Sequence, residues 1–256
     1  MDKVVPKHVY GVKPSSFDHR DFKFAAISQP VAKLPVHVDM RPMMPPVYDQ
    51  GRIGSCTSMG IAAAYEYDLK KQGLKDFLPS RLFIYYNERV IENDVNNDAG
   101  AQIRDGIKSI ATTGICEDVL WPYDESKFTV KPTQEAYNDA LKHKAVKYYN
   151  VPIIEHELKQ ALAQGFPVVA GIMIYESFES EHVADTGYVS MPNPREQLLG
   201  GHCILIVGYN DANNHLIVRN SWGTEWGDKG YFYLPYGYIN PALMSDLWVV
   251  NAITSD

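Results

Sequence analysis

The chain has 256 residues, a formal net charge of −7 at pH 7, 45% hydrophobic residues and 21% charged residues. This length and composition are typical of a globular protein with one large domain or two lobes. The acidic balance argues against nucleic acid or an anionic membrane as the partner, since either would favour a basic surface.

The cysteine count and the lengths of the apolar runs indicate in which cellular compartment the protein is expected. Cys56, Cys116 and Cys203 form an odd set without a pairing pattern, which is typical of a reducing environment. The first thirty residues contain no apolar run of signal-peptide length, and the longest apolar stretch, Cys203–Val207, is strand-sized. We therefore expect a cytoplasmic protein, monomeric, with neither nucleic-acid nor membrane partners.

The first half of the chain predicts mainly helices. Residues 1–33 form a mixed, proline-containing lead-in, interpreted either as an N-terminal arm laid across the body or as a short regulatory segment. Prolines then interrupt regular structure up to Tyr48. Apolar spacing and end signals predict helices over residues 56–73, 80–90 and 103–114.

The second half predicts mainly strands. Two short helices are expected, over residues 133–141 and 154–164, and strands over residues 146–151, 167–175, 202–209, 215–219, 230–234 and 248–250. Helices followed by strands predict an α+β protein with a helical lobe, a β-rich lobe and a cleft between them.

Cys56 lies where the first helix is expected to begin, after the glycine-containing loop Gln50–Ser55. Unpaired backbone N–H groups and the positive end of the helix dipole favour the thiolate, which is the nucleophilic form of cysteine. Gln50 stands on the same loop and can turn back toward the thiol. These features make Cys56 the candidate nucleophile.

A nucleophilic cysteine needs a base and a group that orients the base. His202 follows two glycines and begins the most apolar strand, whereas the other seven histidines lie in irregular or polar segments. If the next strand pairs with it, Asn220 lies beside His202 and its amide oxygen accepts the imidazole N–H. Taken alone, His202 suits a satisfied core histidine equally well, and Asn220–Gly223 suits an ordinary turn.

Together, Gln50, Cys56, His202 and Asn220, with 146 residues from Cys56 to His202, resemble the papain family of cysteine proteases. The similarity runs from about Leu34 to the C-terminus. It implies a papain-like two-lobe α+β fold with a helical left lobe, a β-barrel-like right lobe and the active site between them. The expected divisions are an arm over residues 1–33 and a peptidase domain over residues 34–256, with a helical lobe over about 45–120 and a β-rich lobe over about 121–256.

The resemblance also implies the role of each residue. Cys56 is the nucleophile, His202 its base in an ion pair, Asn220 the orienting amide, and Gln50 an oxyanion-hole donor beside the Cys56 N–H. Trp222 shields the His202–Asn220 bond. Expected substrate-binding residues are Gly54, Gly100, Ala101, Ile103, Gly201, Cys203 and Trp222, with Gly200, Ile103 and Cys203 lining the main specificity pocket.

The sequence departs from the family pattern beside the nucleophile. Ile53 stands where the family usually has a second cysteine, its disulfide partner near Gly100 is absent, and Thr57 replaces an aromatic residue. The usual long pro-region has no counterpart beyond residues 1–33. In these features the chain resembles a compact bacterial or viral-type branch of the family. We expect packing alone to hold the site in this chain. We also expect the N-terminal arm to pack near the cleft and obstruct it.

Two other motifs predict no metal site, and no cofactor is expected. His156-Glu157 begins like a zinc-protease helix but lacks the second histidine. Asp94, Asn96 and Asp98 begin like a calcium loop, but Ala99 replaces the required glycine, so we interpret a solvated loop.

The favoured function is a cysteine endopeptidase that binds an extended peptide or protein segment and hydrolyses it through a thioester at Cys56. The pocket residues suggest an apolar side chain second on the acyl side of the cut bond. Two alternatives stay open: a peptide ligase or cyclase using the same site, and a catalytically silent binding protein that retains the fold.

Overall fold

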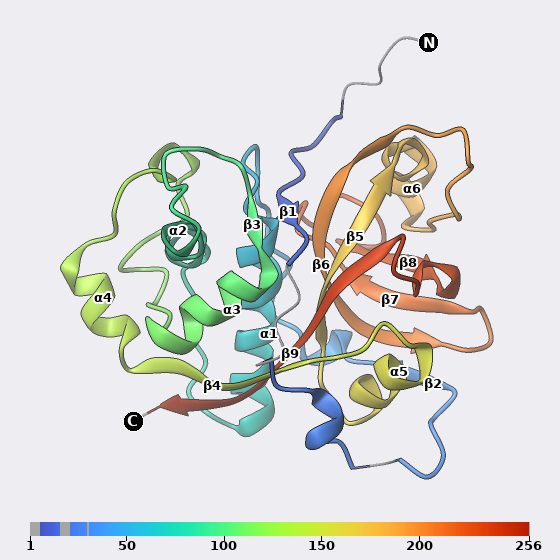
Figure 1. Cartoon of the computed structure of the whole chain (residues 1–256), viewed down its shortest axis with the longest axis horizontal. Helices are drawn as coiled ribbons and strands as arrows, with labels where there is room; N and C mark the ends of the chain where they lie inside the picture. The colour runs from blue at the N-terminus through green and yellow to red at the C-terminus, as the bar shows by residue number, and fades with distance from the viewer. Residues whose placement is uncertain (1–5, 16–20, 30, 256) are drawn as a thin grey trace.

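The structure, a computed structural model, describes residues 6–15, 21–29 and 31–255. The chain forms two lobes, a helical lobe on the left of Figure 1 and a lobe built on an antiparallel sheet on the right. The predicted α+β fold is confirmed. Among the described residues, no helix is long and apolar enough to cross a membrane.

The central helix α1 (Cys56–Gln72) stands between the lobes and packs against β6 and β9 as well as α2 and α3. Its residues from Cys56 to Leu69 are all buried, which agrees with small or apolar residues on every side up to Ala64, and the last turns bury Glu66 and Asp68 as well. Gly73 ends the helix in the left-handed conformation, with φ of 69°. This rigid element therefore presents Cys56 from the core.

The helical lobe is completed by α2 (Arg81–Ile91), α3 (Ile103–Thr112) and α4 (Gln134–Ala140). Ser80 caps α2 by accepting a hydrogen bond from the Phe83 N–H. A separate apolar cluster joins α4 to α2 through Ala136, Ala140 and Phe83, and it includes Ile53. The helix α4, which follows the expected lobe boundary near residue 120, thus packs with the helical side.

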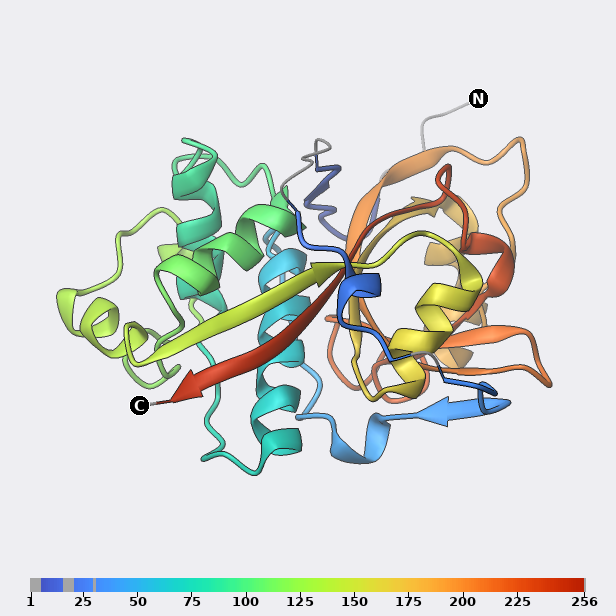
Figure 2. The same ribbon diagram turned by 60° about the horizontal axis from the view of Figure 1, so that its bottom comes forward.

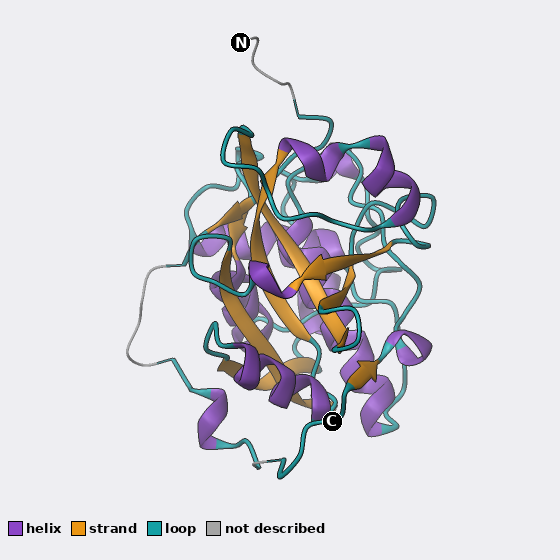
Figure 3. Ribbon diagram, turned by 90° about the vertical axis from the view of Figure 1, so that its right-hand side faces the viewer, coloured by secondary structure: helices purple, strands orange, loops and turns teal. Residues whose placement is uncertain are grey.

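The larger sheet contains seven strands in the order β4-β9-β5-β6-β7-β8, with β2 paired to β6. Figure 3 shows these strands crossing the middle of the molecule with helices around them. The strands are β2 (His37–Asp39), β4 (His143–Asn150), β5 (Val168–Tyr175), β6 (Leu198–Asn210), β7 (His215–Arg219), β8 (Tyr231–Pro235) and β9 (Met244–Ser255).

Most predicted elements agree with the structure to within a few residues, but two strands differ in extent. The strand β6 begins four residues before His202, and β9 is much longer than the predicted strand over 248–250. Its long antiparallel pairing with β4 carries both strands beyond the sheet lobe toward the helices (Figure 2). The short helix α6 (Glu181–Thr186) was not predicted. The predicted helix over 154–164 is α5 (Glu155–Ala163).

The N-terminal arm lies partly on the surface and partly between the lobes: Phe22 is 64% exposed, whereas Gly11 and Val12 are buried. Residues 6–15 enter the groove between the lobes, and β1 (Val12–Lys13) pairs in parallel with β3 (Ala101–Gln102) (Figure 1). Further along, Phe24 is fully buried against the main core. Residues 1–5, 16–20 and 30 of the predicted arm lie outside the described residues.

Candidate active site

Cys56 is the first residue of α1, as predicted, and its side chain is fully buried. The Cys203 N–H donates to the Cys56 Sγ at 3.4 Å, and the nearby backbone N–H groups of Gly11 and Thr57 act on the thiol in the direction that lowers its pKa. Despite these donors, burial raises the pKa of Cys56 to about 11. The expected thiolate is therefore absent while the arm fills the groove.

His202 and Asn220 meet because β6 and β7 are paired, as the sequence predicts. The His202 Nε2 lies 2.8 Å from the Asn220 Oδ1, which also accepts the Ser221 N–H at 2.8 Å. An amide oxygen only accepts hydrogen bonds, so Nε2 carries the proton and Nδ1 keeps its lone pair. Among the described residues, the Nδ1 atom has no hydrogen-bond partner. It is therefore free to accept a proton.

Trp222 shields this pair. Its ring stacks on His202 with centroids 4.9 Å apart and an interplanar angle of 29°. His202 is fully buried, and desolvation lowers its pKa to about 4. Burial thus disfavours the predicted ion pair of His202 with Cys56 in this state, because it raises the pKa of the thiol and lowers that of the imidazole.

Gln50 lies close to the nucleophile with a fixed amide orientation. Its Oε1 accepts a hydrogen bond from the Ser221 hydroxyl at 2.7 Å, so its Nε2 must be the donor. The Nε2 donates to the Ile53 carbonyl at 3.0 Å and to the Val9 carbonyl of the arm at 3.4 Å. A peptide carbonyl oxygen therefore already contacts the donor expected to hold an oxyanion.

The arm passes over most of the predicted substrate-binding residues. The Ala101 N–H donates to the Gly11 carbonyl at 2.8 Å. Gly54 and Gly100 enclose Gly11 so closely that a Cβ on Gly11 would lie 2.0 Å from the Gly54 oxygen. On the other wall, Trp222 stacks on His8 at 3.8 Å.

The specificity pocket differs in detail from the expectation. A Cβ on Gly171 or Gly201 would lie 3.2 Å from the Val12 Cγ1, so these two glycines make the room that Val12 occupies. Gly200 lies instead against Tyr10, and the Cys203 sulfur lies beside Gly60 of α1. Ile103 is fully buried at the start of α3. Gly171 was missed because nothing in a strand sequence marks which glycine faces a pocket.

A second contact of the arm was also missed. Glu179, at the end of the 3₁₀ helix Glu176–Glu179, accepts hydrogen bonds from the Lys7 N–H at 2.9 Å, the His8 N–H at 3.3 Å and the Tyr10 hydroxyl. The Lys7 ammonium group donates to the Glu179 carbonyl at 2.9 Å. This carboxylate anchors the arm on the sheet-lobe side of the groove.

The residues that depart from the family pattern are accounted for by local contacts. Ile53 packs in the apolar cluster of the helical lobe. The Thr57 hydroxyl donates to the Glu88 Oε1 at 2.5 Å, and burial raises the pKa of Glu88 well above its usual value. All three cysteines are free thiols. Packing and buried polar contacts such as that of Thr57 with Glu88 thus hold the start of α1 without a disulfide.

The loop interpreted as solvated is exposed at Asn96, Asn97 and Ala99, and two of its acidic side chains also contact the site and the arm. The Asp98 carboxylate accepts the Gly54 N–H at 2.9 Å and also the Tyr85 hydroxyl, which fixes the loop before the nucleophile. Asp94 faces Lys13 of the arm. Among the described residues, no group of three or more histidine, cysteine or acidic side chains is placed to hold a metal ion.

Comparison with known proteins places this geometry in a family. The profile described as "Papain family cysteine protease" matches residues 34–247, which is most of the chain. The chain belongs to the papain family of cysteine proteases. The family consists of cysteine peptidases, which implies peptide or protein substrates.

Individual relatives agree with this family. An uncharacterised peptidase C1-like protein of Acanthamoeba polyphaga mimivirus is 47% identical over 217 residues, covering 80% of this chain and 70% of its own. Cathepsin K of Gallus gallus is 32% identical over 79% of this chain and 59% of its own length. The crystal structure of xylellain, a cysteine protease from Xylella fastidiosa, superposes with a TM-score of 0.87 at 40% identity, covering 98% and 99% of the two chains.

Proposed function

We propose that the chain is a cysteine endopeptidase that cuts extended peptides through a thioester on Cys56. The observation that carries this proposal is the unpartnered Nδ1 of His202, whose Nε2 is engaged by Asn220. A base in this tautomer accepts the thiol proton while its far side stays oriented.

In the proposed reaction, the His202 Nδ1 takes the proton of the Cys56 thiol and the sulfur attacks the substrate carbonyl carbon. Gln50 and the Cys56 N–H donate to the resulting oxyanion. The tetrahedral intermediate collapses, the C–N bond breaks, and the leaving amine takes the proton from His202. Water, activated by the same histidine, then hydrolyses the thioester and releases the carboxylic acid.

We further propose that the arm keeps this site latent. The specificity pocket holds Val12, which follows Gly11, the residue whose N–H contacts the Cys56 sulfur. In a productive substrate, the residue in an acyl-side pocket precedes the cut bond. The arm therefore runs in the opposite direction, which explains how it fills the groove without presenting a bond for cleavage.

The first test combines thiol labelling with product analysis. We expect iodoacetamide or an epoxide probe to modify Cys56 in preference to Cys116 and Cys203, because displacement of the arm exposes Cys56 alone, and mass spectrometry of peptide products to show cleavage. Labelling without any product would favour the silent binding protein. Joined peptides in place of cleaved ones would favour a ligase or cyclase.

We predict that acid releases the arm. The pKa of His202 is about 4 under the arm and returns toward 6.5 or higher once water enters, so protons bind the open state more tightly. The pKa of His8 is also lowered by burial, which acts in the same direction. Between pH 6.5 and about 4, the closed-to-open ratio should fall by about tenfold per pH unit.

Tryptophan fluorescence can follow this release, because His8 stacks on Trp222 in the closed state. The spectrum should change between pH 7 and pH 5, and the change should be lost in Trp222→Phe. A Trp222 signal that does not vary over this pH range would contradict the prediction.

A further inference from the structure

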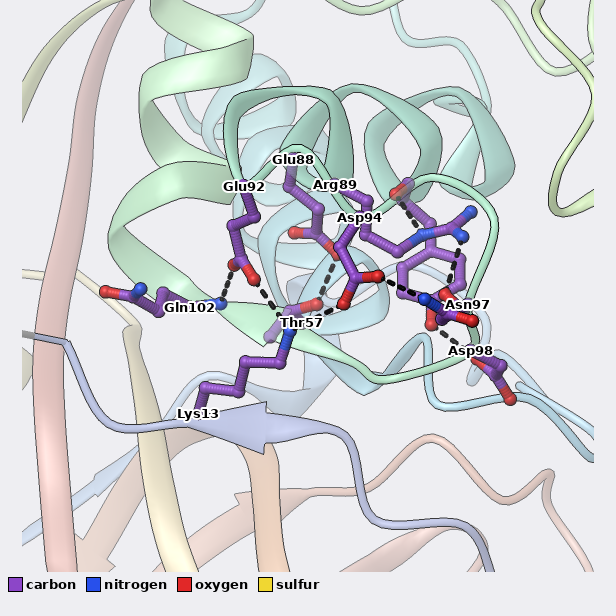
Figure 4. A network of polar contacts seen from close by, with 10 residues as sticks. Lys13, Thr57, Glu88, Arg89, Glu92, Asp94, Asn97, Asp98 and Gln102 are labelled. Carbon is purple, nitrogen blue, oxygen red and sulfur yellow. Dashed lines mark hydrogen bonds and ion pairs between the residues drawn. The ribbon is translucent and has the colours of Figure 1, made fainter.

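Lys13, the arm residue after Val12, also has defined contacts on the helical lobe. Lys13 leaves β1 toward the helical lobe, and its ammonium nitrogen lies 2.8 Å from the Glu92 Oε2 and 3.5 Å from the Asp94 Oδ2 (Figure 4). Successive side chains of an extended strand point to opposite sides. Val12 accordingly faces Gly171 and Gly201 of the sheet lobe, and Lys13 faces the opposite wall.

The surroundings of the Glu92 and Asp94 carboxylates favour a bound cation. Glu92 caps the C-terminus of α2, where the helix dipole already places negative charge, and its side chain is only 8% exposed. The Gln102 N–H binds the Glu92 Oε1 at 2.6 Å, which leaves Oε2 to Lys13. When the arm leaves, this largely buried carboxylate loses the cation that pairs with it, which is unfavourable until another takes its place.

We propose that Glu92 and Asp94 form an acidic subsite that selects substrates with a lysine or arginine third on the acyl side of the cut bond. Gly11 lies at the nucleophile, Val12 is one residue farther and Lys13 two residues farther along β3. A substrate paired with β3 has the same alternation of side chains in either chain direction. Its second side chain therefore enters the Gly171–Gly201 pocket, and its third meets Glu92.

This inference rests on the proposed peptidase function and names its substrate class: an extended peptide with a basic residue third and a small aliphatic residue second. The arm then mimics the substrate by side-chain chemistry while its backbone runs the other way. Glu92 acts as a specificity residue and takes no part in the bond-breaking steps.

The test uses three fluorogenic peptides that end in valine and glycine before the same leaving group and carry lysine, norleucine or glutamate in the third position. For the wild-type chain we expect kcat/KM for the lysine peptide to exceed that for norleucine by about five- to tenfold, and glutamate to be poorest. The ratio does not depend on how often the arm is displaced, since that fraction multiplies kcat/KM for every peptide equally.

Glu92→Gln is the decisive variant because glutamine keeps an acceptor for the Gln102 N–H and removes the charge. It should bring the lysine-to-norleucine ratio close to one, and Asp94→Asn should lower it less. Glu135→Gln makes the same change of charge on the exposed start of α4 and should leave the ratio unchanged.

The same sequences on a thiol-reactive peptidyl probe give the ratio from the rate at which Cys56 is modified, even if the acyl group passes to an amine instead of water. Equal rates for lysine and norleucine in the wild type would overturn the subsite while leaving the peptidase proposal intact. A ratio that survives Glu92→Gln would also overturn it. A chain that neither cleaves nor is labelled by any of these peptides would contradict both proposals.

Discussion

Replacing Cys56 by alanine should lower kcat for peptide hydrolysis by about 10⁴-fold or more. No other thiol can substitute, because the Cys203 sulfur lies against Gly60 and Cys116 is buried in the helical lobe. Removal of a nucleophile leaves only the rate enhancement that binding and the oxyanion donors supply. Burst and steady-state kinetics with a fluorogenic peptide measure the loss.

The fold of Cys56→Ala should persist. The change deletes one buried sulfur at a helix start, so a stability loss of about 1 kcal/mol and a Tm shift of about 2–4 °C are expected. Cys116→Ala is the matched control, since it removes a buried thiol in the separate apolar cluster of the helical lobe and should keep full activity. Activity retained in Cys56→Ala would refute the thioester mechanism.

The sequence predicted a helix that begins at Cys56 and the contact of His202 with Asn220, because these three residues leave local signals. Cys56 begins a helix whose first turns are small or apolar on every side, and His202 interrupts an apolar strand. Asn220 follows a strand whose pairing with the His202 strand can be anticipated. The spacing of apolar residues, which differs between helices and strands, also predicted most elements of the core.

What the sequence did not reveal depends on contacts between distant segments. Nothing local shows that Val12 enters a pocket shaped by Gly171, or that Glu179 receives three donors from the arm. The ionisation of Cys56 was also mispredicted, because a helix start favours thiolate only where water or a cation reaches it. In the closed state the arm excludes water from the groove, and desolvation outweighs the helix dipole.

The acidic loop has partners in the folded chain that its own sequence does not show. Taken alone, Asp94 and Asp98 resemble a solvated turn with too few ligands for calcium. In the folded chain, Asp98 fixes the loop at Gly54 and Asp94 faces the arm lysine, so the same segment supports both the nucleophile loop and the groove. Acidic residues of this kind acquire a function only through partners supplied by other parts of the chain.

Gly11→Ala should activate the chain by displacing the arm. A Cβ at this position would lie 2.0 Å from the oxygen and 2.7 Å from the carbonyl carbon of Gly54, and a backbone neighbour cannot rotate away as a side chain can. Gly11 does not have a positive φ, so alanine is not excluded by its own backbone conformation. Overpacking of this kind destabilises the packed state by about 1–3 kcal/mol.

Only the closed state contains the contact between Gly11 and Gly54, so the penalty falls on that state and shifts the population toward the open one. We expect kcat/KM to rise by about tenfold or more, with kcat at saturating substrate changed less, because substrate and arm compete for one groove. Val9→Ala is the control: its side chain is 37% exposed and its carbonyl is retained, so activity should stay near that of the wild type. A Gly11→Ala chain no more active than the wild type would show that the arm does not limit access to Cys56.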